Sequence, residues 1–377
     1  MSTHSPLGMS SASRYIKCPG SVGLGWGVED EESEYAAEGT AAHALAETCL
    51  NSGADAWEHL PFHGKDTADA VQVYLNAVRE AHPDRNQSNF FVERRFHCEE
   101  LNEFYYGTSD CTYIDLEQRT LHVWDYKHGV GIVVEVEENP QLMGYGAGML
   151  VDLQLSGAID WVVLHVAQPR AFHPDGPVRE WRISTGELWT WLWSVLLPAM
   201  DQAMVSTDTQ SGEHCRFCPA RSRNCPQIAA DMDELEELMK MFEGGTADEL
   251  TDAQVARFMN LLEVAKIAAK AANSTAYTRM QAGGIIPGYK LVSGRANRVW
   301  KADAINAASD KFGDRALTAP EMKSPAEIEK LPMGKDFAAQ YAYKPDVGLV
   351  VAKDTDTRKT VDNKVKSLFA DATKEKK

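Results

Sequence analysis

The chain has 377 residues, of which 44% are hydrophobic and 25% are charged, as in an ordinary globular protein with a sizeable core. Its formal net charge of −17 argues against a protein that coats nucleic acid without selectivity, because such proteins are basic. We see no export signal and no apolar run of the roughly 18 residues that a membrane helix needs, so we expect a cytoplasmic protein without a membrane segment.

Hydrophobic periodicity predicts helices and strands over residues 1–226. In chain order these are helices over 35–50 and 66–81, strands over 89–96, 111–117 and 121–126, a helix over 140–155, strands over 160–167 and 178–183, and a helix over 185–204. Asn139 and Pro140 fit the N-cap and the first residue of the third helix.

Two residues in this region have more than one interpretation. His43 lies in an alanine-rich helix in the pattern Gly-Thr-x-x-His, where a histidine is packed, exposed or a metal ligand. Glu93 is either a minor member of a site or, as we expect, a cross-strand partner of an arginine. The spacing alone leaves the role of His43 open.

Acidic residues flank the predicted hairpin. Asp110 ends a Gly-x-x-Asp pattern where a turn becomes a strand, and the second strand leads into Asp125-Tyr126-Lys127. Side chains two residues apart on a strand point to the same face, so Asp125 and Lys127 aim at one spot. A carboxylate there can hold a hard cation while the lysine stabilises an oxygen that the cation activates. The alternative is a surface ion pair.

The helix that follows adds a second pair. Gln141 and Tyr145 are four residues apart and therefore share one helix face. Asp110, Asp125, Lys127, Gln141 and Tyr145 in this order and spacing are harder to obtain by chance than Asp-x-Lys alone.

Four of the seven cysteines suggest a metal centre. Cys215, Cys218 and Cys225 form Cys-x2-Cys-x6-Cys, and Cys18, which also precedes a proline, is the best candidate for a fourth thiolate. Zinc and an iron–sulfur cluster both accept such ligands, and His214 is an alternative fourth ligand for zinc. We interpret the remaining cysteines, Cys49, Cys98 and Cys111, as small buried residues.

The chain changes character after residue 226. Helices are predicted over 227–242 and 251–281, followed by a stretch that alternates aromatic and basic residues. The residues of this stretch that suit a nucleic-acid strand are Arg295, Arg298, Trp300 and Lys301. A hairpin with a cationic outer face is the alternative. We expect two domains, 1–226 and a mainly helical region over 227–377.

Gly-x-x-Asp, Asp-x-Lys and Gln-x-x-x-Tyr in this order resemble the PD-(D/E)xK nuclease superfamily over about residues 10–226. The helix with Gly-Thr-x-x-His, together with one distant and three clustered cysteines, resembles its RecB-like and Cas4-like members. The chain, including its Pro-Gly-Tyr-Lys-Leu-Val stretch, is also similar to the phage and prophage family DUF2800.

This resemblance implies an α/β, restriction-endonuclease-like fold, in which a mixed central sheet is flanked by helices and extended by a mainly helical C-terminal region. It implies Mg²⁺ or Mn²⁺ bound by His43, Asp110, Asp125 and the carbonyl of Tyr126. Lys127 would position the attacking water, and Gln141 and Tyr145 would orient the site or touch DNA. A [4Fe–4S] cluster, or alternatively Zn²⁺, would be held by Cys18, Cys215, Cys218 and Cys225.

The implied activity is that of a metal-dependent DNA exonuclease in phage recombination or end-processing, located in the cytoplasm. Its expected partners are single- or double-stranded DNA ends, a phage single-strand annealing or single-strand-binding protein, and further copies of the chain. The alternatives are a catalytically inactive DNA-binding or assembly module and a zinc-stapled recombination accessory protein.

Overall fold

A computed structural model describes residues 6–28, 34–59, 63–222, 225–244, 250–294, 299–301, 304–318, 321–322, 324–329, 331, 333–343 and 349–353. The chain divides into two compact units, Met1–Ala268 and Ala269–Lys377. The first unit contains the predicted domain over 1–226 and also helix α9 (Pro226–Gly244) and the start of α10 (Asp252–Gln281).

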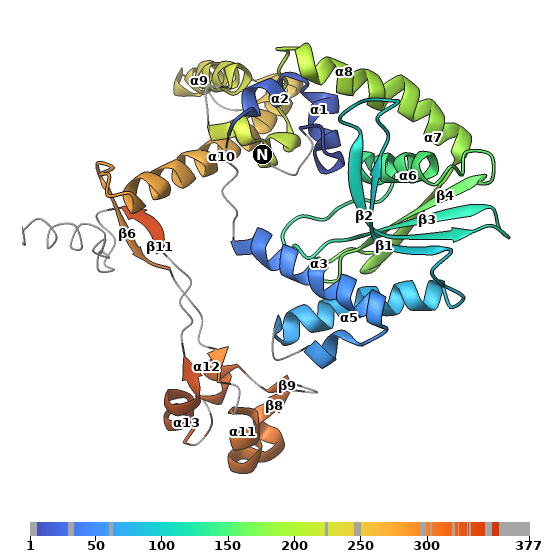
Figure 1. Cartoon of the computed structure of the whole chain (residues 1–377). Helices are drawn as coiled ribbons and strands as arrows, with labels where there is room; N and C mark the ends of the chain where they lie inside the picture. Colours follow the sequence, from blue (N-terminus) through green and yellow to red (C-terminus); the bar gives the residue numbers. More distant parts are fainter. Residues whose placement is uncertain are drawn as a thin grey trace, which may run out of the picture. The chain divides into compact units, whose positions relative to one another are not determined.

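A five-stranded mixed sheet lies at the centre of the first unit, in the order β1-β2-β3-β4-β5 (Figure 1). Its strands are β1 Phe90–His97, β2 Tyr106–Asp115, β3 Thr120–Tyr126, β4 Trp161–Ala167 and β5 Val178–Ser184. Neighbouring strands are antiparallel except for the pair β3–β4, which is parallel because helix α6 (Pro140–Asp152) makes the crossover between them. The predicted mixed sheet is therefore confirmed.

Helices cover both faces of this sheet (Figure 1). One face packs against α3 (Glu34–Ser52) and α5 (Lys65–Ala81) around the buried Trp124 and Tyr126. The other face packs against α6 and against a helical run that begins at Thr185. The short elements that complete the first unit are η1 Met9–Ser11, α1 Ala12–Lys17, α2 Gly20–Gly25, η2 Ala56–His59, α7 Thr185–Trp191, η3 Leu192–Leu196, α8 Leu197–Val205, η4 Glu213–Phe217 and η5 Pro219–Ser222.

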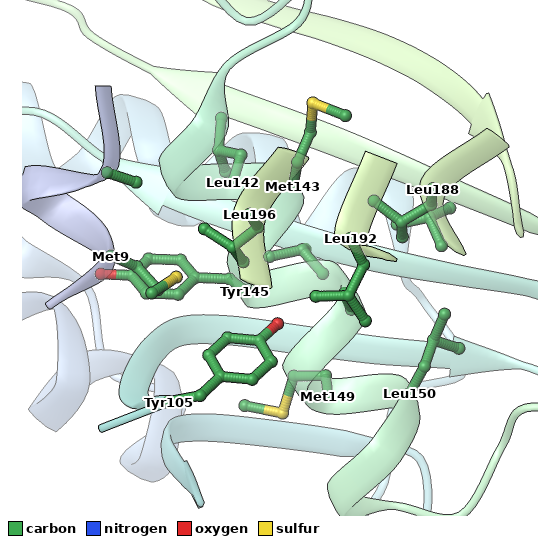
Figure 2. Close-up of a cluster of buried hydrophobic side chains, with 14 of the residues drawn as sticks. Met9, Tyr105, Leu142, Met143, Tyr145, Met149, Leu150, Leu188, Leu192 and Leu196 are labelled. Carbon is green, nitrogen blue, oxygen red and sulfur yellow. The ribbon is translucent and has the colours of Figure 1, made fainter. Parts of the chain in front are cut away.

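Helix α6 lies in the middle of the larger core, and Figure 2 shows side chains from three other parts of the chain around it. Met9 belongs to the N-terminal segment, Tyr105 is the residue before β2, and Leu192 belongs to the helical run after β5. The helix begins where predicted, since the Asn139 side chain accepts hydrogen bonds from the first-turn amides and Pro140 is the first helical residue. Its N-terminus lies beside the end of β3, which places Gln141 next to Lys127.

The second unit joins the end of α10 to short paired strands and helices. Its paired strands are β6 Tyr289–Ser293 with β11 Leu349–Lys353, β7 Val299–Trp300 with β10 Ala342–Tyr343, and β8 Leu317–Thr318 with β9 Glu321–Met322. Its helices are α11 Ala304–Phe312, η7 Gly313–Ala316, α12 Pro325–Ile328 and α13 Gly334–Tyr341. A small core around Phe337 and Ile328 packs these helices together. Over the described residues, no helix of either unit combines the length and apolarity needed to cross a bilayer.

Candidate active site

The site lies where the sheet opens between β2 and β3. The β2–β3 ladder ends at the pair Cys111–Trp124, and beyond it the Asp110 carboxylate takes a backbone hydrogen bond. Oδ2 of Asp110 accepts from the N–H of Tyr126 at 2.8 Å. This bond holds Asp110 against the backbone of residue 126, whose carbonyl the resemblance identifies as a metal ligand.

Asp125, Lys127, Gln141 and Tyr145 form one chain of hydrogen bonds. Lys127 Nζ lies 2.9 Å from Asp125 Oδ1 and donates to Gln141 Oε1 at 3.0 Å. Gln141 Nε2 in turn donates to the Tyr145 hydroxyl at 3.0 Å. These four side chains therefore lie together, as their spacing on the strand and on the helix predicted. Asp110 is tied to the same strand by its hydrogen bond from the backbone N–H of Tyr126.

The Asp125 carboxylate is buried and has one cationic partner. Asp125 is only 2% exposed, and Lys127 Nζ lies 2.8 Å from its Oδ2 and 2.9 Å from its Oδ1. A carboxylate with two oxygens offers more acceptor sites than one ammonium fills, and a hard cation could occupy the rest. Carboxylate, carbonyl and imidazole donors are a set that Mg²⁺ or Mn²⁺ accepts, so the residues present fit the predicted metal.

His43 and Glu93 approach Asp110 from two other elements. His43 Nδ1 on α3 lies 3.5 Å from Asp110 Oδ2. In the part of the chain that the structure describes, His43, Glu93 and Asp110 form a group whose ligand atoms all lie within 4.8 Å of one another. The histidine is therefore near the carboxylate that the resemblance assigns to the same metal.

The expected arginine partner of Glu93 is not what the structure shows. Arg94 instead donates to Asp152 at 2.7 Å, and the Arg95 guanidinium lies over the ring of Tyr106. The prediction for Glu93 was therefore wrong: both neighbouring arginines have other partners, and Glu93, with a φ of +48°, is left out of the pairing between β1 and β2. Nothing in the sequence around Glu93 predicts this backbone conformation.

The buried carboxylates make the site strongly electronegative. Burial, opposed by His43 and Lys127 and supported by the charge of Asp125, raises the pKa of Asp110 to about 6. Burial, together with the charges of Asp110 and Glu47, raises the pKa of Glu93 to about 7. Burial is the main cause of both shifts and repulsion between the carboxylates adds to it, and a bound divalent cation would lower both pKa values.

A second polar cluster, which the sequence did not reveal, lies beside the end of β3. The Tyr126 hydroxyl is 2.7 Å from His128 Nδ1, and Arg170 donates to Glu38 Oε1 at 2.8 Å. Arg170 also lies against His128, so the cluster joins α3 to the segments that follow β3 and β4. The sequence contains one hint of this cluster, which is that Glu38 precedes His43 on the same helix.

The four predicted cysteine ligands gather at the N-terminal segment of the first unit. Cys18 follows α1, Cys215 lies in η4, and Cys218 and Cys225 come after it in the chain. Burial raises the pKa of Cys215 to about 11, with smaller contributions from the charges of the other three, so the four thiols lie within electrostatic reach. The backbone N–H of Gln210 donates to Cys18 Sγ at 3.4 Å. His214, the alternative ligand, has its Nε2 2.8 Å from the Gln210 carbonyl.

The predicted nucleic-acid contacts of the second unit are only partly described. Lys301 is exposed, and its Nζ donates to the Gln340 carbonyl. The backbone of Trp300 pairs with Ala342 in β7 and β10. Arg295 and Arg298 lie outside the described residues.

The comparisons with known proteins concern the whole chain. The family described as "Protein of unknown function (DUF2800)" matches residues 4–359. No solved structure matches the chain. Because the match extends through both compact units, the chain belongs to the DUF2800 family.

Proposed function

We propose that the protein is a metal-dependent deoxyribonuclease that hydrolyses phosphodiester bonds, with DNA ends as its substrate. The observation that carries the proposal is the buried Asp125, whose carboxylate pairs with Lys127 Nζ while Gln141 Oε1 accepts from the same ammonium. An ion pair with no further role needs neither burial of the carboxylate nor the amide that holds the ammonium from the other side.

Each residue has a separate task in this proposal. Asp110, Asp125 and the Tyr126 carbonyl would hold the cation, which supplies an activated water and neutralises charge on the phosphate. Lys127 is 24% exposed at its side chain, so its ammonium can meet the substrate and stabilise the oxygen anion that develops. Gln141 keeps Nζ in position, and Tyr145 keeps Gln141 in position.

We further propose that the four cysteines hold a [4Fe–4S] cluster. Zn–S bonds of about 2.3 Å would draw tetrahedral thiolates to within roughly 4 Å of one another. A cubane cluster takes the same four thiolates at a wider spacing, and the charges of Cys18, Cys218 and Cys225 all act on Cys215. The N–H···S bond from Gln210 to Cys18 is of the kind that tunes iron–sulfur clusters.

The experiment is strand degradation by anaerobically purified protein on end-labelled linear DNA, single- and double-stranded, with Mg²⁺ or Mn²⁺. We expect the wild type to shorten DNA from an end, and Asp110→Asn and Lys127→Ala to abolish cleavage while remaining folded. Lys65→Ala, which removes a surface lysine from α5, is the matched control and should cleave like the wild type.

Two results would change this proposal. Cleavage of closed circular DNA at the same rate would make the enzyme an endonuclease. If the wild type and both site variants were equally inert while folded and metal-loaded, the protein would be a DNA-binding or assembly module without cleavage activity.

A further inference from the structure

We propose that the turn after β4, residues 168–172, binds the substrate strand, with Arg170 on a phosphate of DNA and Phe172 stacked on a base beside it. The inference deepens the proposed nuclease function, on which it rests, because it adds a substrate-binding element to the same site. Neither residue belongs to the sequence patterns that carry the nuclease resemblance.

The turn lies at the edge of the sheet where the candidate active site lies. Strands β3 and β4 are parallel, so their C-terminal ends meet at one edge, where the pair Tyr126–Ala167 is the last of their ladder (Figure 1). The backbone N–H of Lys127 then donates to the Ala167 carbonyl at 2.9 Å. The turn therefore begins beside the lysine of the site, at the edge where sheets of α/β proteins usually bind ligands.

Arg170 is held at one end of its guanidinium and is free at the other. Its Nη1 donates to Glu38 Oε1 at 2.8 Å and also to His128 Nε2, which must accept because a guanidinium has only donors. Its Nε and Nη2 donate to no described residue, and its side chain is 24% exposed. These two nitrogens form the edge of a guanidinium that binds a phosphate through two parallel hydrogen bonds.

The same contacts connect Arg170 to the residues around the proposed cation. His128 Nδ1 lies 2.7 Å from the Tyr126 hydroxyl, and the Tyr126 ring packs edge-on against His43 with 5.4 Å between the ring centroids. Arg170 is therefore joined to the His43 side of the site through one histidine and one tyrosine. A DNA strand whose scissile phosphate lies at the cation brings a neighbouring phosphate to this guanidinium.

Phe172 supplies an aromatic surface on the same turn. Its exposed fraction of 89% is the largest among the described large hydrophobic residues. Ala171, between Phe172 and Arg170, is buried, and its N–H donates to the Gln168 carbonyl at 3.4 Å. An exposed ring on an anchored turn, two residues from a free guanidinium edge, suits a base next to its own phosphate.

The buried Gln168 ties this turn to the segment that follows β3. Its Nε2 donates to the carbonyls of Gly129 and Ile132, and its Oε1 accepts from the N–H of Val134 at 2.9 Å. The segment held in this way exposes the apolar side chains of Val130 and Ile132. Apolar surface beside the turn favours contact with bases, whereas phosphates need donors.

A single DNA strand is the ligand that fits this surface. A base offers its face to Phe172 only where that face is not already stacked inside a duplex. A duplex also carries a higher density of phosphates than one strand, and a chain with a net charge of −17 repels it more strongly. One guanidinium edge and one ring match one phosphate and one base.

The experiment measures binding of a labelled oligonucleotide, single-stranded or in a duplex, by fluorescence anisotropy with Ca²⁺ as the cation. We expect the single strand to bind more tightly. Phe172→Ala should weaken its binding about fivefold or more, the scale of one base stacked on an aromatic ring, and Phe172→Trp should retain it. Trp193→Ala, which removes an exposed ring from the helical run after β5, is the matched control and should bind like the wild type.

Arg170 and its partner Glu38 distinguish a DNA contact from a structural ion pair. Arg170→Gln should weaken binding and reduce the slope of log affinity against log salt concentration by about 0.7, the value for one phosphate contact of a single strand. Glu38→Gln keeps the guanidinium and should bind at least as tightly as the wild type. If both variants weaken binding equally, Arg170 acts only through the ion pair and the inference is wrong. Tighter binding of the duplex by the wild type would also overturn it.

Cleavage by the same preparations with Mg²⁺ or Mn²⁺ separates this inference from the proposed function. If Arg170→Gln and Phe172→Ala lose binding of the single strand but the wild type cleaves no DNA, the nuclease proposal fails while the binding turn stands. If the wild type cleaves DNA and both variants bind and cleave as it does, the nuclease stands and the turn is not a binding element.

Discussion

At the scale of single residues, a cluster of three histidines, two of them buried and His122 half-buried, determines how the fold responds to acid. His82 and His165 pack against Trp124, His122 packs against both of them, and the Trp124 indole N–H donates to His82 Nε2 at 2.9 Å. Because that nitrogen accepts a hydrogen bond, His82 is neutral. Burial lowers the pKa of His82 to about 3, that of His122 to about 4, and that of His165 well below its usual value.

These shifts predict a loss of stability as the pH falls below about 6.5. The unfolded chain then takes up protons that the folded protein does not, so the free energy of unfolding should fall by about 1–2 kcal/mol for each of these histidines by about pH 5. Chemical denaturation at several pH values measures this slope. His82→Gln should reduce the slope, and His97→Gln, at an exposed position, should not. An unchanged slope in His82→Gln would show that these rings are not its source.

Residues of the site differ in how far the sequence predicted them. Asp125, Lys127, Gln141 and Tyr145 meet because of spacings of two on a strand and four on a helix, which are local and therefore readable. Glu93 depends on a single backbone angle. The cluster of Glu38, His128 and Arg170 joins segments up to 132 positions apart, so it depends on the folded sheet rather than on any local pattern.

At the scale of elements, glycines in α6 allow this helix to lie close to the sheet. A Cβ atom added to Gly148 would lie 2.3 Å from the Phe96 ring, which is itself 1% exposed and packed against Tyr105 and Tyr145. Helix α6 can therefore lie this close to β1 only because Gly148 has no side chain. Because Gln141 lies on the same helix, that separation also sets where Lys127 is held.

Gly148→Ala should therefore both destabilise the fold and weaken cleavage. We expect a loss of about 1–3 kcal/mol, the range for overpacking a core, measured by chemical denaturation. Gly186→Ala is the matched control, because Gly186 lies in α7 with no atom within 4 Å of the added Cβ. Alanine there should be neutral or stabilising by up to about 1 kcal/mol. Equal stability of Gly148→Ala and the wild type would show that α6 can shift freely.

The strands were predictable because apolar runs bounded by turns are local signals, and four of the five lie within one residue of their predicted ranges. The exception is β2, which begins at Tyr106 instead of residue 111, so the prediction that Asp110 lies where a turn becomes a strand was wrong: Asp110 lies inside the strand, because residues 106–109 pair with β1. The helix predicted over 185–204 differs in one respect. It consists of α7, a π-helical turn at Leu192–Leu196, and α8. Pro198, which has no N–H to donate, lies in the first turn of α8 and accounts for the changed hydrogen-bonding pattern. Periodicity averaged over twenty residues does not show such a turn.

At the scale of the whole molecule, the cysteines connect the start of the chain to the segment that closes the sheet domain. Cys18 lies between α1 and α2, and the other three ligands follow α8. The N-terminal segment that Cys18 anchors also carries Met9, which packs against Gly144 of α6. A metal centre that binds only the folded chain adds its binding free energy to stability, and the proposed centre would hold the N-terminal segment against α6, the helix that carries Gln141.

Removal of one cysteine ligand should therefore affect both metal content and the remote site. We expect Cys218→Ala to lose the visible absorption and the iron of anaerobically purified protein, to melt at a lower temperature, and to cleave DNA more slowly. Cys49→Ala, which alters a buried cysteine in the core on the α3 side, should retain its iron. Zinc in place of iron in the wild type, lost in Cys218→Ala, would identify the alternative metal at the same ligands. Equal metal content in Cys218→Ala and the wild type would mean that the four cysteines form no metal centre, and the N-terminal segment would then be held by packing alone.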